Sequence, residues 1–372
     1  MGARPINPAS ALHKISNRVR RMNFIAIGNR TVGQGSPALI VAEVAQAHDG
    51  SLGTAHAFID AVADAGADAV KFQTHLAIEE STFDEPFRVP LSEQDSTRFG
   101  YWKRTEFTPD QWGGLAAHAR ERQLIFLSSP FSIAAVKLLE GIDVPAWKVG
   151  SGEFASRELW TAMALTQKPI IFSTGLASWI EIEAAVRFFK SRCLPFALLQ
   201  CTTSYPTSLE EIGLNVIADL REEFECPVGL SDHSGTVFPG LAALARGADI
   251  LEVHVTFHRA MFGPDAHASL TFDELRLLCN MRDSLVTMDS HPIDKTETAK
   301  RLDILRETFG RSLAPIRSLP VGTVLSLEML TSKKPGGGIP PEAGQLLVGR
   351  VLARDVTPDR ILRWSDLAEE TT

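Results

Sequence analysis

The sequence predicts a (β/α)8 barrel followed by a small β-rich domain. Eight short apolar runs alternate with amphipathic stretches between residues 38 and 256, which is the pattern of parallel strands joined by helices. After about residue 285 the pattern changes to short strands broken by glycine and proline. A doubly wound open sheet is the alternative for the first part, but eight consecutive units favour a closed barrel.

The predicted strands are β-rich and do not alternate strictly, as expected of strands that are buried on both faces. In order they are Ala38–Ala45, Ala69–Gln73, Leu124–Ser129, Ala146–Glu153, Pro169–Gly175, Phe196–Tyr205, Pro227–His233 and Ile250–Thr256. Helical patterns such as AHAFIDAVADAGA (residues 55–67) and EIEAAVRFFK (residues 181–190) lie between them.

We expect four parts in the chain: an arm over residues 1–35, the barrel over 36–285, a linker over 286–312 and the β-rich domain over 313–372. The first 22 residues carry five basic residues and no acid, so a targeting peptide is the alternative to an arm. Residues 291–302 are polar and predicted to be helical. Three segments with short strand patterns broken by glycine or proline predict the β-rich domain: SLPVGTVLS, KKPGGGIPP and VGRVLARDVTPDRIL.

The composition excludes several classes of function. Hydrophobic residues make up 44% and charged residues 22% of the chain, as in ordinary globular proteins, and no apolar stretch approaches the length of a membrane span. The net charge of −8 argues against nucleic acid as a partner. The four cysteines show no CxxC spacing, so we expect reduced thiols in a cytoplasmic protein.

Polar residues gather at the predicted C-terminal ends of the strands, where barrel enzymes carry their chemistry. Buried polar groups need partners, so packing alone does not explain this concentration. The residues are Glu43, Lys71, Gln73, Lys148, Ser151, Glu153, Ser173, Thr203, Tyr205, Ser231, His233, Glu252 and His254.

Two histidines are candidate metal ligands. His233 in SDHSG and His254 in LEVH each end an apolar run, so they meet if the two strands are neighbours. Two neutral imidazoles with oxygen ligands form a plausible open site for a divalent metal. The adjacent acids, Asp232 and Glu252, could fix the imidazole tautomers. The alternative is that both are ordinary buried histidines.

The segments KVGSGE and STG predict an anion cradle. Lys148, Ser151 and Ser173 supply an ammonium group and hydroxyls, and the neighbouring glycines allow close backbone approach. Simple strand-to-helix turns are the alternative. Lys71 could be an anion clamp or a Schiff-base nucleophile.

Three acids complete the candidate set. Glu43 and Glu153 are candidate general acids or bases, unless they only pair with lysines. Asp265, in the loop after the eighth strand, could hydrogen-bond a polyol.

Taken together, the motifs resemble the sialic acid synthase family, the phosphoenolpyruvate-dependent synthases of nonulosonic acids. The tail resembles that family's C-terminal antifreeze-like (SAF) domain, and the resemblance covers roughly residues 36–368. The matching pieces are IVAEVAQAHDG, AGADAVKFQT, KVGSGE, STGLAS, CTTSYPT, GLSDHSG, LEVHVT, GPDAHASLTFDEL and SLPVGTVLSLEML with KKPGGGI and LVGRVLARDV.

The resemblance implies a transferase that condenses phosphoenolpyruvate with the open-chain aldehyde of an N-acylated aminohexose and releases phosphate by C–O cleavage. The sugar would be N-acetylmannosamine or a precursor of the legionaminic or pseudaminic type. A divalent metal, most often Mn²⁺ with Mg²⁺ or Co²⁺ as alternatives, would be held by His233 and His254. A homodimer with swapped C-terminal domains is also implied.

The resemblance assigns roles to the other candidates. Glu43 and Glu153 match carboxylates near the reacting atoms. Positions near phosphoenolpyruvate match Lys71, Lys148, Ser151, Ser173, Thr203 and Ser231, and positions near the sugar match Gln73, Tyr205 and Asp265. We also place Glu252 among the substrate-binding residues. An arginine that the family's C-terminal domain sends into the partner subunit's site matches Lys334.

The sequence departs from the family at several positions. Thr203 replaces an asparagine, Val253 a lysine and Lys334 an arginine, and the stretch AQAHDG at Ala45–Gly50 is altered. The aromatic segment Ser92–Trp112 is a predicted lid or specificity loop. Two other functions therefore stay open: a Schiff-base aldolase that uses Lys71 or Lys148, and a catalytically impaired homologue that only binds a sugar.

Overall fold

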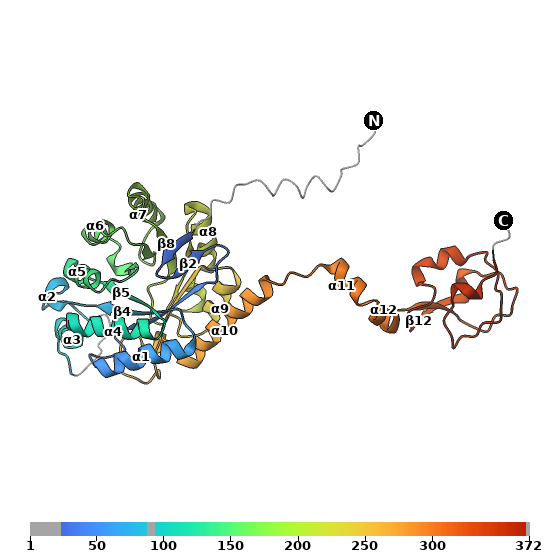
Figure 1. Cartoon of the computed structure of the whole chain (residues 1–372), viewed down its shortest axis with the longest axis horizontal. Coiled ribbons are helices and arrows are strands. Elements are labelled where there is room, and N and C mark those ends of the chain that lie inside the picture. The colour runs from blue at the N-terminus through green and yellow to red at the C-terminus, as the bar shows by residue number, and fades with distance from the viewer. Residues whose placement is uncertain (1–23, 88–93, 370–372) are drawn as a thin grey trace, which may run out of the picture. The chain divides into compact units, whose positions relative to one another are not determined.

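The computed structural model describes residues 24–87 and 94–369, and the chain divides into two compact units after Asp289. The first unit is a barrel of eight parallel strands with helices on its outside (Figure 1), which confirms the predicted fold. The strand order is β5-β4-β3-β10-β9-β8-β7-β6, and the two end strands, β5 and β6, contact each other. The strands are β3 (Leu39–Ala45), β4 (Ala69–Thr74), β5 (Ile125–Pro130), β6 (Trp147–Val149), β7 (Ile170–Ser173), β8 (Phe196–Cys201), β9 (Val228–Asp232) and β10 (Ile250–His254).

Each of the eight strands overlaps one predicted apolar run, and two of the runs extend four residues beyond the end of their strand. β6 ends at Val149, and Ser151–Glu153 forms a single 3-10 turn. β8 ends at Cys201, so Thr203 and Tyr205 lie in the loop that follows. Gly150 directly follows β6 and explains its early end, because glycine weakens the interior of a strand.

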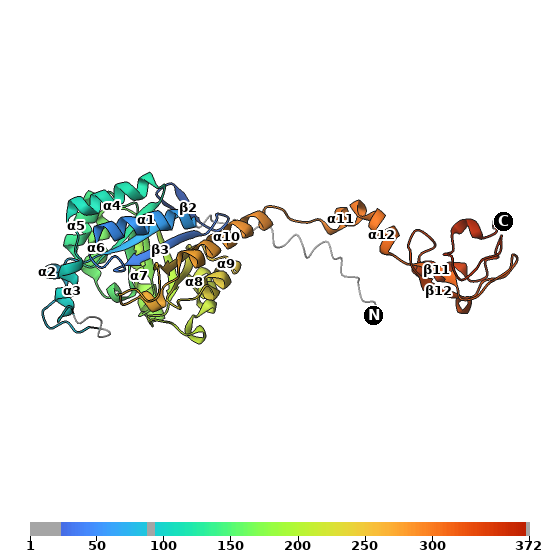
Figure 2. The same cartoon turned by 90° about the horizontal axis from the view of Figure 1, so that it is seen from below.

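The outer layer consists of helices that pack on the strands. These helices are α1 (Leu52–Ala65), α2 (Ala77–Glu80), α3 (Arg98–Thr105), α4 (Pro109–Glu121), α5 (Ile133–Gly141), α6 (Arg157–Leu165), α7 (Trp179–Ser191), α8 (Leu214–Phe224), α9 (Phe238–Ala245) and α10 (Phe272–Asp289). Local sequence fixes several helix ends. At α4, for example, Thr108 and Gln111 form a capping box, and Pro109 occupies the first turn. Helices α1 and α4 lie side by side (Figures 1 and 2).

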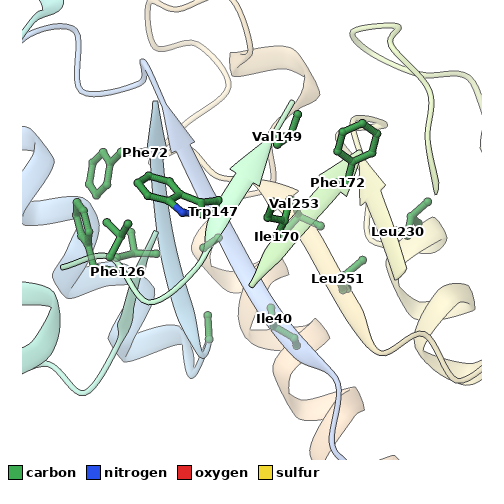
Figure 3. Packing of buried hydrophobic residues seen from close by; sticks show 14 of the residues in the cluster. Ile40, Phe72, Phe126, Trp147, Val149, Ile170, Phe172, Leu230, Leu251 and Val253 are labelled. Carbon is green, nitrogen blue, oxygen red and sulfur yellow. The ribbon is translucent and has the colours of Figure 1, made fainter. Parts of the chain in front are cut away.

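The barrel strands carry two separate apolar layers, because successive side chains point to opposite faces. Outward-facing residues such as Ile40, Phe72, Phe172 and Leu251 pack against the helices (Figure 3). Inward-facing residues near the N-terminal ends of the strands, among them Leu39, Val41, Leu127, Ile171 and Leu199, form a second core inside the barrel.

A β-hairpin joins this inner core. Strands β1 (Phe24–Ile27) and β2 (Arg30–Gly33) pair antiparallel, and Ile25, Ile27 and Val32 are buried with the inward-facing barrel residues. The segment predicted as an arm over residues 1–35 is therefore folded from Phe24 onward, and residues 1–23 lie outside the described part. No helix in the described ranges combines the length and apolar character needed to cross a bilayer.

The second unit has its own small core. Strands β11 (Ser312–Pro315) and β12 (Leu330–Lys333) pair antiparallel, and Leu313, Leu325, Leu352 and other apolar residues are buried together. This agrees with the predicted β-rich domain. Within the predicted linker, helix α10 runs to Asp289, and α11 (Lys295–Arg301) and α12 (Asp303–Phe309) belong to the second unit.

We predict that Gly229→Ala destabilises the barrel by about 2 kcal/mol, because overpacking a close-packed core costs about 1–3 kcal/mol. A Cβ at Gly229 in β9 would lie 2.0 Å from the carbonyl oxygen of Ile250 in β10 and 2.9 Å from Leu199. Gly114→Ala in α4 is the control, since a Cβ there meets no atom within 4 Å and alanine favours helix by about 0.5–1 kcal/mol. Urea unfolding of both variants measures the difference, and equal midpoints would contradict the packing argument.

Candidate active site

A cavity of about 230 Å³ lies at the C-terminal ends of the barrel strands. Every one of the eight strands contributes a lining residue, either from its last positions or from the loop that follows it. The predicted site residues that line the cavity are Glu43, Lys71, Gln73, Lys148, Ser151, Ser173, Thr203, Tyr205, Ser231, His233, Glu252, His254 and Asp265. The structure therefore brings together residues that are as far as 222 positions apart.

Strand register explains why these side chains converge. His254 pairs with Glu43 across β10 and β3, and Glu43 pairs with Lys71 across β3 and β4. Glu252 pairs with Ser231 across β10 and β9. Paired residues on parallel strands point to the same face, so all of these side chains face the barrel interior.

A buried charge cluster forms the floor of the cavity. The carboxylate oxygen Oε1 of Glu252 lies 3.4 Å from Nζ of Lys148 and 3.7 Å from Nζ of Lys71. It also accepts a hydrogen bond of 3.1 Å from the hydroxyl of Ser231. Lys71 forms a second ion pair with Glu43. Glu252 thus contacts two ammonium groups in a buried site, and removing it would leave Lys148 without its carboxylate and Lys71 with Glu43 alone.

Burial and neighbouring charges shift the pKa values in this cluster in opposite directions. Burial lowers the pKa of Lys71 to about 7, although the Glu252 carboxylate raises it; the nearby Lys148 cation lowers it further. Burial alone would raise the pKa of Glu252, but the ammonium groups of Lys148 and Lys71 outweigh it and bring that pKa to about 2. Glu252 is therefore ionised at neutral pH, and Lys71 is close to its titration midpoint.

The predicted anion cradle lies beside this cluster. Nζ of Lys148 donates a 2.8 Å hydrogen bond to the hydroxyl of Ser173, and the backbone N–H of Gly175 donates to the hydroxyl of Ser151 at 3.1 Å. A Cβ at Gly175 would lie 2.6 Å from the Thr203 hydroxyl and 2.7 Å from that of Ser151, so glycine leaves room for both. The site combines one ammonium group with several hydroxyls, which suits a carboxylate or a phosphate.

The two candidate metal ligands lie next to each other. Asp232 pairs with Val253, and the residues that follow, His233 and His254, have ring centroids 5.2 Å apart. Burial and the neighbouring His254 lower the pKa of His233 to about 3. His233 is therefore neutral at physiological pH, which is the form that binds metals.

The hydrogen bonds of His233 define its tautomer. Nδ1 lies 3.1 Å from the carbonyl oxygen of Thr202, which can only accept, so Nδ1 carries the proton. Nε2 therefore has the free lone pair, and the Tyr205 hydroxyl lies 3.1 Å from it. A backbone carbonyl that orients a ring in this way is a common support for a metal ligand.

The donor set around the two histidines fits a divalent metal. Asp265 lies 3.9 Å from Nδ1 of His254, and both residues line the cavity. Within residues 24–87 and 94–369, no group of three or more His, Cys, Asp or Glu side chains is placed to hold one ion. A metal at the histidine pair would therefore take further ligands from other oxygen donors, such as water or a substrate.

Two predicted site residues lie elsewhere. Glu153 lines a neighbouring hollow, which shares Phe131 with the cavity, and its carboxylate accepts a 2.8 Å hydrogen bond from Ser156. Burial raises the pKa of Glu153. Lys334 belongs to the second unit, where it lines a basic hollow with Lys333, Arg360 and Arg363. The roles assigned to Glu153 and Lys334 remain predictions.

The sequence analysis missed several residues that line the cavity: Gln46, His75, Phe87, Arg98, Tyr101, Trp102, Ser129, Phe131 and Cys201. The ring of His75 stacks between Trp102 and Phe131, with centroid distances of 3.7 and 4.2 Å. Its Nε2 lies 3.2 Å from Oε1 of Gln73. Trp102 belongs to α3, inside the aromatic segment that was predicted as a lid or specificity loop; residues 92 and 93 of that segment lie outside the described part.

The fold and the cavity define a barrel enzyme with an appended β-rich domain, and comparison with known proteins identifies its family. The NeuB family model matches residues 58–291, and the SAF domain model matches residues 310–368. The chain belongs to the NeuB family.

Three relatives illustrate this. The N,N'-diacetyllegionaminic acid synthase of Campylobacter jejuni is 31% identical, with 87% of this chain and 98% of the relative covered. The human N-acetylneuraminate-9-phosphate synthase is 31% identical, with 89% and 92% covered. The crystal structure of N-acetylneuraminic acid synthetase from Leptospira borgpetersenii, in complex with citrate, superposes with a TM-score of 0.66 at 29% identity over 77% of this chain and 98% of that one.

We predict that Glu252→Gln lowers the free energy of unfolding by about 3 kcal/mol, because it leaves the buried ammonium group of Lys148 without its carboxylate and removes one of the two carboxylates beside Lys71. The difference in stability between the variant and the wild type should grow as the pH falls from about 7 to 5.5. Loss of Glu252 lowers the pKa of Lys71 in the folded protein below about 7. Over this pH range the wild-type Lys71 takes up its proton, whereas the variant has to keep Lys71 neutral in the folded state and loses stability. Urea unfolding at several pH values measures both effects.

The control for this prediction is Glu183→Gln. Glu183 is exposed and pairs with Arg187 on the surface of α7, so its replacement should change stability by at most about 0.5 kcal/mol. Similar losses in the two variants would mean that the buried cluster does not depend on Glu252.

Proposed function

We propose that this protein is a nonulosonic acid synthase that condenses phosphoenolpyruvate with the open-chain aldehyde of an N-acylated aminohexose. The observation that carries the proposal is the composition of one cavity. A lysine- and serine-lined part, suited to an anion, lies beside two histidines suited to a metal, and one of them, His233, is neutral. The similarity to sialic, legionaminic and pseudaminic acid synthases supports this reaction class.

Phosphoenolpyruvate would bind at the charged part of the cavity. Lys148 and Ser173 are already hydrogen-bonded to each other, and Ser151 lies beside the backbone N–H of Gly175. An anion bound here stabilises the ammonium form of Lys71, whose pKa of about 7 leaves it partly neutral in the free protein. Ser231 and Thr203 complete the set of hydroxyls. At position 203 the family usually has an asparagine, so Thr203 would offer one hydroxyl where relatives offer a side-chain amide.

The acceptor sugar would bind with its aldehyde toward His233 and His254. A divalent metal held by these two residues, which we expect to be Mn²⁺ with Mg²⁺ or Co²⁺ as alternatives, would polarise the carbonyl oxygen of the aldehyde. The protonated Nδ1 of His233 donates to Thr202 and so fixes the ring with Nε2 facing the cavity. Gln73, Tyr205 and Asp265 are the proposed partners of the sugar hydroxyls.

In the proposed reaction the enol carbon of phosphoenolpyruvate attacks the aldehyde carbon, and a new C–C bond forms. The aldehyde oxygen takes up a proton, and water adds to the oxocarbenium carbon and loses a proton. The C–O bond to phosphate then breaks, which leaves a 2-keto acid and inorganic phosphate. Glu43, which is ion-paired with Lys71 and pairs with His254 across β3 and β10, is our candidate for exchanging these protons. We retain Glu153 as a second candidate.

The same proposal extends to the assembly. A homodimer would bring Lys334 of each SAF domain toward the partner's cavity, where its ammonium group would contact the acyl group of the sugar. Lysine carries a compact ammonium group there, whereas arginine would carry a planar guanidinium group that can form two parallel hydrogen bonds.

A Schiff-base aldolase remains the second candidate, because the pKa of Lys71 near 7 is a property that such enzymes need in their nucleophile. Its ion pair with Glu43 and its proximity to Glu252 favour the anion-binding role. Borohydride trapping with pyruvate separates the two, since a stable covalent adduct forms only through an imine.

The test of the proposal is phosphate release from phosphoenolpyruvate with a panel of N-acylated hexoses, with Mn²⁺ or with a chelator. We expect release to depend on the sugar, because the new C–C bond needs its aldehyde carbon. We also expect release to depend on the metal, because the metal would polarise that aldehyde. Absence of release with every sugar, from folded and metal-loaded protein, would refute the synthase.

We predict that His254→Ala abolishes high-affinity Mn²⁺ binding and lowers the rate of phosphate release at least about a hundredfold, since it removes one of two protein ligands. Titration calorimetry with Mn²⁺ reports binding independently of turnover. His291→Ala, at an exposed position in the second unit, is the control and should change neither. A variant at position 254 that is active without metal would remove the histidine pair from the metal site.

A further inference from the structure

His75 is a buried residue of the cavity wall that the proposed reaction does not use. Its Nδ1 lies 2.5 Å from Oε1 of Glu80, and only 6% and 7% of the two side chains are exposed. Oε2 of Glu80 accepts a 3.1 Å hydrogen bond from the backbone N–H of Leu76. Both carboxylate oxygens of Glu80 are therefore engaged within the protein, and the His75–Glu80 pair has a fixed position at the cavity.

Two aromatic rings hold the imidazole of His75 in place. Trp102 and Phe131 stack on it, and each ring is inclined to it by 12°. A ring stacked in this way keeps its plane, so its two nitrogens point in fixed directions. Nδ1 faces Glu80, and Nε2 lies 3.2 Å from Oε1 of Gln73, which lines the cavity.

The neighbouring oxygen atoms define the protons of the pair. Oε1 of Gln73 is a carbonyl oxygen that can only accept, so Nε2 carries a proton. A second proton lies between Nδ1 and the carboxyl oxygen of Glu80, because two facing lone pairs would repel each other. The pair therefore holds two protons without net charge, and it gains or loses them as one unit.

Charged and titratable groups from neighbouring elements face the pair. Burial raises the pKa of Glu153, the Glu80 carboxylate adds to that rise, and His75 opposes it. Burial and the charge of His75 lower the pKa of His48 to about 3. Arg98 of α3 lines the same cavity. Of these groups, Glu80 is the one that hydrogen-bonds to the ring, so its replacement changes the protons of the pair directly.

We propose that His75 is a positioning residue for Gln73. Its Nε2–H holds the carbonyl oxygen of the Gln73 side chain, so the NH2 group of that amide is left to donate to an oxygen atom of the acceptor sugar. This inference rests on the proposed synthase function, in which Gln73 contacts the sugar.

The proposal implies a pH dependence with a defined sign. Loss of the shared proton leaves Glu80 ionised and the remaining ring proton on Nδ1, so Nε2 becomes an acceptor. The Gln73 amide then has to turn and present its carbonyl oxygen to the cavity. Binding of the acceptor sugar therefore weakens as the pH rises.

The experiment measures the KM of the N-acylated hexose that supports phosphate release, at saturating phosphoenolpyruvate and Mn²⁺, from about pH 6 to 9. In the wild type we expect this KM to rise about fivefold, the effect of one neutral hydrogen bond. In Glu80→Gln an amide N–H faces Nδ1, so the neutral ring keeps its proton on Nε2 and the rise should disappear. Glu79→Gln, at an exposed position of α2, is the matched control and should keep the wild-type profile. Equal profiles in the wild type and Glu80→Gln would overturn the inference.

The variant His75→Phe removes both ring nitrogens and keeps a ring between Trp102 and Phe131. We expect the KM of the hexose at neutral pH to rise about fivefold, with the KM of phosphoenolpyruvate unchanged. An unchanged KM of the hexose would exclude His75 as the positioning residue.

Nitrogen-15 NMR of the histidine rings tests the proton assignment without turnover, and the His75 signals are identified by their change in Glu80→Gln. We expect a proton bonded to Nε2 at neutral pH, and an Nε2 with a lone pair would overturn the inference even in an active enzyme. Absence of phosphate release by the wild type with every hexose would instead count against the synthase function, and the NMR result would still decide the proton assignment.

Discussion

The site depends on one buried interaction, the contact of the Glu252 carboxylate with the ammonium groups of Lys71 and Lys148. Two buried cations so close together repel each other and lose their hydration, and the carboxylate between them offsets part of that cost. The offset is incomplete for Lys71, whose pKa falls to about 7. The free protein therefore stabilises the ammonium form of Lys71 only in part, and the anion of the proposed function would stabilise it further.

The barrel makes this arrangement possible by separating apolar from polar interior positions. Near the N-terminal ends of the strands the inward-facing residues are apolar, and the β1–β2 hairpin seals them from solvent. Toward the C-terminal ends the same inward-facing rows become Glu43, Lys71, Ser231 and Glu252. Parallel register then places residues from neighbouring strands side by side, as for Glu43 and Lys71. A packed apolar base thus fixes the charged groups above it.

The sequence predicts the parts of the molecule that depend on periodicity and strand ends. All eight barrel strands and the cavity-lining candidates from Glu43 to Asp265 follow from apolar runs and from the polar residues that end them. The hairpin at residues 24–33 was missed because two four-residue strands carry little pattern. The cavity-lining residues Tyr101 and Trp102 were missed because they lie on a short helix whose partners, Ala77 and the residues after β3, are distant in sequence. Glu153 illustrates a further limit, since the glycines before it end the strand early and turn its side chain into another hollow.

His233 stays neutral even though it lies beside charged residues, and burial is the main reason. The carboxylates of Glu252 and Asp265 raise the pKa of His233, yet desolvation and the adjacent His254 outweigh them and bring it to about 3. The protonated Nδ1 is committed to Thr202, so the lone pair on Nε2 remains available at neutral pH. The cavity therefore presents three chemically different surfaces: the lysine cluster, the two imidazoles, and the aromatic rings of Tyr101 and Trp102. The first suits an anion and the second suits a metal ion, so the proposed pair of substrates would use the cavity more fully than either substrate alone.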